Sequence, residues 1–135
     1  MTVPYIDAKI YDALTARLAT MTGRVAIVKP GQTYPTSPDV PFILVTDAKL
    51  GNDRAYIGST ADDVHTGDLM LDVMVPLSWT HSQHLGIAGG IIAWFTKDLL
   101  LGGLVRITKT PAVTVAYRDG GFMRLPVAVS WRAMG

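Results

Sequence analysis

The stretch Asp68-Leu-Met-Leu-Asp-Val-Met-Val-Pro-Leu77 decides the fold class of this chain. Aliphatic residues occupy every second position in it, from Leu69 to Leu77, and the residues between them are of mixed polarity. Because successive side chains of a strand point to opposite faces of a sheet, this period of two predicts a long β-strand with one buried face.

The other face of the predicted strand carries Asp68, Met70, Asp72 and Met74. The two aspartates would lie about 13 Å apart, at roughly 3.3 Å per residue, which is too far for a pair of catalytic carboxylates. We therefore interpret them as solvated. The two methionines leave the face only half polar, so that they either meet another chain or lie beneath a helix or loop.

A second alternating stretch, from Met123 to Trp131, predicts the last strand of the chain. Before it, Arg118-Asp-Gly-Gly121 predicts a tight hairpin, because an Asp-Gly pair tolerates positive φ. Pro126 has no backbone N–H to donate. We therefore expect this strand at an edge of the sheet, or with a neighbour on one side only at that point. An edge strand would offer unpaired backbone groups to a neighbouring subunit.

Two amphipathic helices are predicted. In the first, from about Pro4 to Met21, isoleucine or leucine recurs four residues apart at positions 6, 10, 14 and 18. The second begins at Thr80-His-Ser-Gln83, which matches a capping box, and we expect it to end near Leu101. Its glycines are interpreted as close packing contacts with a neighbouring element. Its expected core residues are Leu85, Ala88, Ile92, Phe95 and Leu99.

Shorter strands are predicted at 25–28, 42–45 and 104–107, and from Val113 to Tyr117. Residues 29–41 and 47–67 are predicted to be unstructured connections of unusual length, a kind of segment that is commonly functional. The order of elements predicts an α+β fold: an antiparallel (mixed) β-sheet with two main helices packed on one face. A chain of 135 residues is expected to form one domain, residues 1–135.

Composition and motifs argue against several classes of function. The chain has no cysteine and a net charge of +1, which excludes thiolate chemistry and predicts no strong hold on a phosphate backbone. It has no nucleophile elbow, Walker loop or dinucleotide fingerprint. His81 and His84 could form half a metal site, but only the isolated His65 could add a ligand, so we interpret them as surface polar residues.

No secretory signal is expected at the N-terminus. The apolar stretch Leu85–Phe95 is about half as long as the roughly 20 residues that a membrane span needs, so no membrane partner is expected. We therefore predict a protein that is not an enzyme and that has no metal and no cofactor.

Several segments together resemble the small tail-terminator-like (tail completion) proteins of long-tailed bacteriophages. The similarity spans nearly the whole chain: an N-terminal amphipathic helix, a proline-rich loop into Pro-Phe-Ile-Leu-Val, a helix ending in Ala-Trp-Phe and a Leu-Val-Arg-Ile-Thr strand. The most specific parts are Gly67-Asp-Leu-Met-Leu-Asp-Val-Met-Val-Pro76 and the closing hairpin, residues 119–132.

The resemblance implies a structural virion protein, assembled in the host cytoplasm and placed at the head-proximal end of the tail. Members of this family look like subunits of a homohexameric ring that caps the tail tube, stops its polymerisation and presents a surface to the head–tail connector protein. The tail tube protein and other copies of the chain would be its partners, and DNA would pass through without specific binding. On this hypothesis the loops at 29–41 and 50–57 contact neighbours or the tube. Candidate anchor residues are Tyr34, Arg54, Tyr56 and Arg118.

Two alternatives stay open. The chain could be another neck protein, such as a head-completion or stopper protein. It could also be a small-ligand-binding or enzymatic α+β domain, which would place an apolar pocket with converging polar groups near His65, His81 or His84.

Overall fold

A computed structural model describes residues 6–21, 26–29, 31–32, 40–54 and 63–134, and its fold is α+β, as predicted. Within these residues it has two helices and one mixed sheet of eight strands. The helices are α1 (Ile6–Ala19) and α2 (His81–Trp94). The strands are β1 (Ala26–Val28), β2 (Phe42–Arg54), β3 (Asp63–Pro76), β4 (Leu100–Leu101), β5 (Val105–Ile107), β6 (Ala112–Val113), β7 (Tyr117–Asp119) and β8 (Phe122–Met134).

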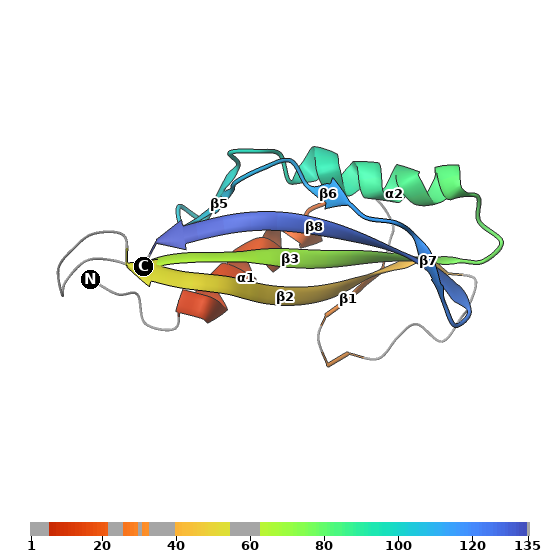
Figure 1. Ribbon diagram of the computed structural model, residues 1–135, viewed down its shortest axis with the longest axis horizontal. Coiled ribbons are helices and arrows are strands. Elements are labelled where there is room, and N and C mark those ends of the chain that lie inside the picture. The colour runs from red at the N-terminus through yellow and green to blue at the C-terminus, as the bar shows by residue number, and fades with distance from the viewer. Residues whose placement is uncertain (1–5, 22–25, 30, 33–39, 55–62, 135) are drawn as a thin grey trace.

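Three long strands, β2, β3 and β8, form the body of the sheet (Figure 1). The strand order is β1-β2-β3-β8-β5-β4, and the short strands β6 and β7 also pair with β8. Only β1 and β2 run parallel among the described pairs. The alternation that predicted β3 and β8 is confirmed: β8 spans its predicted stretch and extends beyond it, and β3 begins five residues earlier than predicted and ends at Pro76, so that Leu77 is an exposed turn residue.

The last strand does not lie at an edge of the sheet, but the alternative, a strand partner on one side only at Pro126, is confirmed. β8 pairs with β3 along one side, and β5, β6 and β7 share its other side. Pro126 is tolerated because it lies between the segments that β6 and β7 cover. There the Pro126 carbonyl accepts a hydrogen bond from the Thr114 amide at 3.1 Å, and no amide of residue 126 is needed. The hairpin turn before β8 is confirmed, with Gly120 at φ 60°.

The predicted unstructured connection at 47–67 is also wrong for most of its length. β2 continues to Arg54 and pairs with β3 from Asp63 onward, with a bulge between Lys49 and Gly51. Ladder hydrogen bonds join backbone groups, so this arm forms although its sequence lacks an apolar alternation. Residues 55–62 and most of the predicted loop at 29–41 lie outside the described residues.

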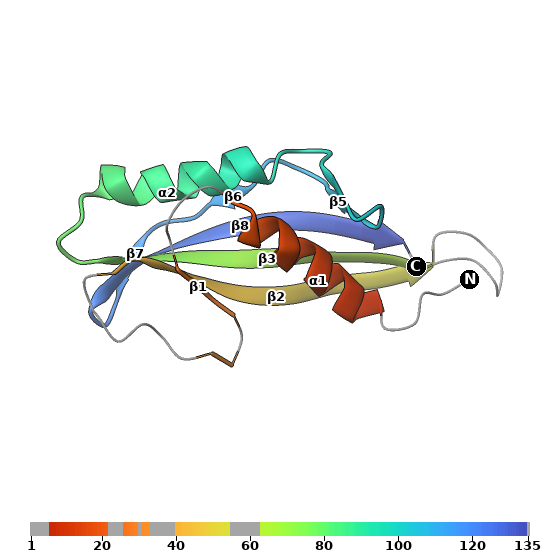
Figure 2. The ribbon, with the colours of Figure 1, turned by 180° about the vertical axis from the view of Figure 1, so that it is seen from behind.

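Both helices pack on one face of the sheet, as predicted (Figure 2). The odd-numbered residues of β3 and β8 face them, and Ile10, Leu14 and Leu18 of α1 are all at most 1% exposed. Trp131, which is 2% exposed, is opposite Gly67 in the register. The core thus combines one sheet face with the apolar stripes of two helices.

The second helix is shorter than predicted: it ends at Trp94 and is capped by Phe95. Its start at Thr80 is confirmed, since the hydroxyl of Thr80 and the side chain of Gln83 form the capping box. After the helix, Asp98 adopts φ 68° and its amide donates to the Ile107 carbonyl at 2.7 Å. Leu100 and Leu101, which were expected at the end of the helix, instead form β4 and pair with β5. The sequence did not distinguish the two, because a short apolar run suits a buried strand as well as a helix.

The buried stripe of α2 begins one residue earlier than predicted, at His84 in place of Leu85, because this histidine is part of the core. His84, Ala88 and Ile91 are its buried residues, whereas Leu85 is 42% exposed. The three glycines of α2 are exposed and have open space where a Cβ would be, so the interpretation as packing contacts is wrong.

The two helices are joined by a reciprocal contact between Arg17 and Trp94. The Arg17 Nε and Nη2 atoms donate to the Trp94 carbonyl at 3.1 and 2.9 Å, and the indole Nε1 donates to the Arg17 carbonyl at 2.9 Å. The guanidinium also lies 4.0 Å from the centre of the indole ring. The cation therefore satisfies a carbonyl at the C-terminus of α2, where the helix dipole favours positive charge.

We predict that Arg17→Lys lowers the free energy of unfolding by about 1–2 kcal/mol, because lysine keeps the charge but loses the planar stacking and one of two hydrogen bonds. Urea denaturation measures the change. The exposed control Lys9→Arg should shift the midpoint by much less, and equal midpoints for wild type and Arg17→Lys would contradict the role of this contact.

Candidate functional site: the outer face of the sheet

The face of the sheet turned away from the helices, here called the outer face, carries the even-numbered residues of β3 and β8. One end of it holds a second apolar cluster, in which Val28, Phe42 and Met74 are buried. The rings of Phe42 and Phe122 meet edge to face, with 5.2 Å between their centres. Met74 is thus packed within its own chain, as one of the two interpretations expected, while Met70 is half-buried.

Asp72 is not solvated, contrary to the prediction: it is 5% exposed and bound to Arg124. Both the Nε and Nη2 atoms of Arg124 donate to the Asp72 Oδ2 atom, and the Nη1 atom donates to Asp119 at 3.0 Å. Burial alone would lower the pKa of Arg124, but the hydrogen bonds from Asp72 and Asp119 outweigh it and raise that pKa. This network ties the β7–β8 hairpin to β3.

Further along the outer face, the Ser130 hydroxyl donates to Asp68 at 2.8 Å, across the register pair that the two residues form. They line a shallow pocket of about 400 Å³ together with Lys109 and Arg132. Asp68 is therefore half-buried, and the basic residues of the same pocket are Lys109 and Arg132.

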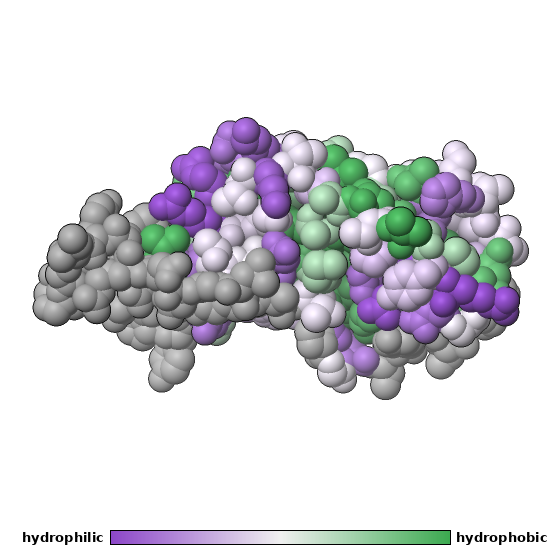
Figure 3. Space-filling model, in the orientation of Figure 1, coloured by the Kyte–Doolittle hydropathy of each residue, from purple (hydrophilic) through white to green (hydrophobic). Residues whose placement is uncertain are grey.

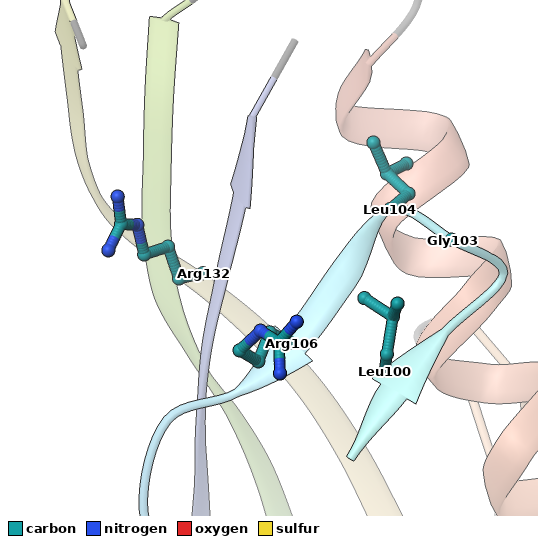
Figure 4. Close-up of a pocket in the computed structure, with 5 residues that line it drawn as sticks. All are labelled: Leu100, Gly103, Leu104, Arg106 and Arg132. Atoms are coloured by element: carbon teal, nitrogen blue, oxygen red, sulfur yellow. The ribbon is translucent and has the colours of Figure 1, made fainter. Parts of the chain in front are cut away.

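A second pocket, of about 410 Å³, adjoins the first at Arg132 (Figure 4). Its other charged residue is Arg106, which is directly opposite Arg132 in the register of β5 and β8. Both arginines are exposed and lie on the outer face, since their strand neighbours Val105 and Ala133 are buried in the core. The apolar part of this pocket is formed by Leu100, Gly103 and Leu104.

The third feature is an exposed apolar segment along the side of β8 that does not pair with β3, here called the far side of β8. Val115 is 86% exposed, and Val113 and Tyr117 are 36% and 48% exposed. In Figure 3 the hydrophobic residues lie mainly in the right half of the view, interspersed with hydrophilic ones, and a group of hydrophilic residues lies at the end that carries β5. Single exposed apolar residues are ordinary, but three within five positions are typical of a contact surface.

The sequence-predicted anchors are not brought together in the described structure. Arg118 is exposed on β7, and its Nε atom donates to the Gly120 carbonyl at 3.4 Å. It pairs with Met123, which packs against the core, so the strand alternation places it on the helix-bearing side. Arg54 is the last residue of β2, and its side chain is outside the description. Tyr34 and Tyr56 lie outside the described residues.

The histidines do not converge on one site. His81 and His84 line a pocket of about 270 Å³ at the start of α2, and the His84 Nε2 atom contacts the Val73 carbonyl at 2.7 Å. His65 is buried eight residues before Val73 on β3, or roughly 26 Å away at 3.3 Å per residue. His84 is buried, so its interpretation as a surface residue is wrong.

Neither a metal-binding group of side chains nor a membrane-spanning helix occurs among the described residues. No group of three or more acidic or histidine side chains is arranged there to hold a metal ion. Neither described helix has the length and apolar character that a membrane crossing requires.

Comparison with known proteins gives a family and a fold. A family model described as "Phage tail terminator protein" matches residues 9–131. Nine solved chains match the structure. One of these is similar with a TM-score of 0.73, over 94% of this chain and 94% of its own, at 15% sequence identity. Such a likeness shows the fold alone. No curated protein matches the sequence.

We predict that Asp72→Asn lowers the free energy of unfolding by about 3 kcal/mol, because it removes the buried charge that pairs with the half-buried Arg124 guanidinium and leaves only the exposed Asp119 as its charged partner. The double variant Asp72→Leu with Arg124→Met should recover most of this loss, since it removes both charges. Thermal and urea denaturation measure both. If the double variant loses as much free energy of unfolding as Asp72→Leu and Arg124→Met lose in sum, the ion pair is not the dominant interaction here.

We also predict that the protein loses stability on acidification through His84. Burial lowers the pKa of His84 below its ordinary 6.5, although the hydrogen bond to the Val73 carbonyl acts in the opposite direction. The unfolded chain therefore binds a proton near pH 6.5 when the folded chain does not, and the free energy of unfolding falls as the pH drops below that value. His84→Gln should show a shallower pH dependence in urea titrations. Equal slopes for the two proteins would count against this.

Proposed function

Because this chain belongs to the phage tail terminator protein family, we propose that it forms a ring on the end of the tail tube, stops the tube from growing and provides the surface for joining the head. Membership makes it a structural protein of the phage tail and a component of the virion, in a family not known for catalysis. The observation that carries the proposal is the family match over residues 9–131, nearly the whole chain.

The sheet supports a ring because its two ends differ. A ring requires a heterologous interface, in which one patch of a subunit meets a different patch of the next. One end of the sheet is the parallel strand β1, and the other end carries β4, with β6 and β7 along the same side of β8. The exposed segment Val113–Tyr117 lies on that side. We propose that this side packs against a different surface of the next copy, in a hexamer.

The sequence-predicted anchors enter this proposal as residues of the subunit or tube contacts: Tyr34, Arg54, Tyr56 and Arg118. Of the four, Arg118 has a described side chain, and it is exposed on a short strand of the same side as Val115. The net charge of +1 suits a ring through which DNA passes without a strong hold.

A ligand-binding or enzymatic function has less support. The pocket near His81 and His84 measures about 270 Å³, below the usual range of ligand sites, and His65 is not part of its lining. A head-completion or stopper role shares the tail context, and the experiment below separates it from the terminator role.

The test uses tails of the phage that encodes this chain, assembled without it. We expect purified chain to form closed rings in native mass spectrometry and electron microscopy, and to bind one end of each tube. Tubes that receive it early should have a uniform length. Binding to head portals with no effect on tubes would favour the stopper role, and a monomer that binds neither would contradict the proposal.

A matched pair of variants tests the ring contact. Val115→Asp removes the most exposed apolar residue of the far side of β8, and we expect it to weaken ring formation about tenfold or more, because a charge would have to be buried there. Leu85→Asp, on the exposed side of α2, is the control. Equal rings from both variants would show that the Val113–Tyr117 segment is not part of the subunit contact.

A further inference from the structure

The pocket at the start of α2 combines apolar walls with a buried histidine. Val75, Leu77, Trp79 and Met123 form the apolar part of its lining, and His84 also lines it. Val75 and His84 are 1% and 2% exposed, so they form the base of the pocket, whereas Leu77 is 42% exposed and lies at its mouth. A group that enters this pocket therefore passes apolar side chains and ends at an imidazole.

The hydrogen bond of His84 determines what its ring offers to the pocket. The Val73 carbonyl can only accept, so the Nε2 atom carries the hydrogen and donates it. Burial lowers the pKa of His84, which keeps the ring neutral at pH 7, and the Nδ1 atom then has a lone pair and no hydrogen. Within the described residues this atom has no hydrogen-bond partner, and it keeps some contact with solvent. The base of the pocket therefore presents an unused acceptor.

The pocket suits one aromatic side chain that ends in a hydrogen-bond donor. Its volume of about 270 Å³ lies below the usual range of small-molecule sites, which begins near roughly 300 Å³. The walls favour an apolar ring, and the acceptor at the base favours a donor at the tip of that ring. A tyrosine side chain has both, whereas phenylalanine would cover the Nδ1 atom of His84 without pairing it.

Tyr117 of another copy has the required exposure and chemistry. It is 48% exposed, and its hydroxyl forms no hydrogen bond among the described residues. The other described tyrosine, Tyr11, is half-buried. Of the tryptophans, Trp79 belongs to the pocket itself, Trp94 donates to α1, and Trp131 is buried. Tyr117 also ends the Val113–Tyr117 segment that is proposed above as a subunit contact.

Tyr117 and the pocket lie on opposite faces of the sheet. Tyr117 pairs with Arg124, which binds Asp72 on the outer face, while the next residue, Met123, lines the pocket on the helix-bearing face. Both lie at the end of the molecule that holds β7 and the start of α2 (Figures 1 and 2). One copy can thus give its tyrosine to one neighbour and receive a tyrosine from the other, which is the heterologous contact that a ring needs.

Resting on the proposed function, we propose that the pocket at the start of α2 binds the Tyr117 side chain of the next copy, whose hydroxyl donates to the Nδ1 atom of His84. The aromatic ring is then buried between Leu77 and Met123. A buried aromatic anchor in a fitted pocket is the kind of residue that carries much of the binding energy of an interface. The family match does not assign this contact.

Single variants measure the contact through the dissociation constant of ring assembly. We expect Tyr117→Phe to weaken assembly about tenfold, because the ring still fits but the Nδ1 atom loses its donor. Its urea midpoint should equal that of the wild type, since the hydroxyl has no described hydrogen bond within the chain. Leu77→Lys should weaken assembly by about tenfold or more, because it places a charge at the mouth of the pocket. Leu85→Lys is the matched control, since both leucines are 42% exposed, and it should assemble normally.

The double variant Tyr117→Phe with Leu77→Lys shows whether the two residues act at one contact. If they do, the double variant should weaken assembly clearly less than the product of the two single effects. An effect equal to that product would show that the residues act independently and would overturn the proposal. Unchanged assembly of both single variants would overturn it as well.

Photocrosslinking identifies the occupant of the pocket. His81→p-benzoylphenylalanine places a photoreactive group on an exposed residue of the lining, and Ala93→p-benzoylphenylalanine places it on an exposed residue at the other end of α2. The sample is an equal mixture of ¹⁵N-labelled and unlabelled chain, assembled on tail tubes. After irradiation, mass spectrometry should find position 81 joined to the peptide that contains Tyr117 of a chain with the other label, and position 93 should give no such adduct.

The remaining outcomes each contradict a stated part of the account. An adduct of position 81 with a different tail protein, or with Tyr117 of its own chain, overturns the choice of occupant. If rings form on the tubes and position 81 gives no adduct with Tyr117, only this contact fails. If the wild-type chain forms no ring and does not bind the tubes, the proposed function fails and this contact fails with it.

Discussion

The structure depends on the pairing of β3 along both of its sides. From Val64 to Pro76 this strand is bonded to β8, and from Asp63 to Met74 it is bonded to β2. A strand held on both sides cannot slip by one residue without turning its buried face outward. The register of β3 therefore fixes which residues meet the helices and which form the outer face, and every other feature follows from that division.

The two faces have different chemistry as a consequence. The helix-bearing face is a continuous apolar core, closed by the contact between Arg17 and Trp94. The outer face has no helix over it in the described structure, and it combines the buried ion pair of Asp72 and Arg124 with the exposed arginines 106 and 132. The exposed apolar residues near Val115 lie along the far side of β8. Surface of this kind suits a structural protein of the phage tail, in a family not known for catalysis.

Sequence reasoning predicted the elements whose side chains alternate or repeat and missed those fixed by distant pairing. The period of two at Leu69–Leu77 was decisive because one face of β3 is buried. The outer part of β2 was missed because its sequence has no apolar alternation, while its backbone pairs with β3. In α2 the buried stripe was displaced because His84, a polar residue, belongs to it. The Arg106–Arg132 pair could not be predicted at all, because it depends on the register between two strands that are far apart in the sequence.

The central claim is that this chain works through contacts made by the outer face and the far side of β8. Hydrogen–deuterium exchange, measured on the free chain and on the chain within assembled tails, tests it most directly. The account predicts that assembly slows exchange in the Val113–Tyr117 segment, while the amides of α1 near Leu14 are unchanged. Slower exchange confined to the helices, with the far side of β8 as open as in the free chain, would contradict it.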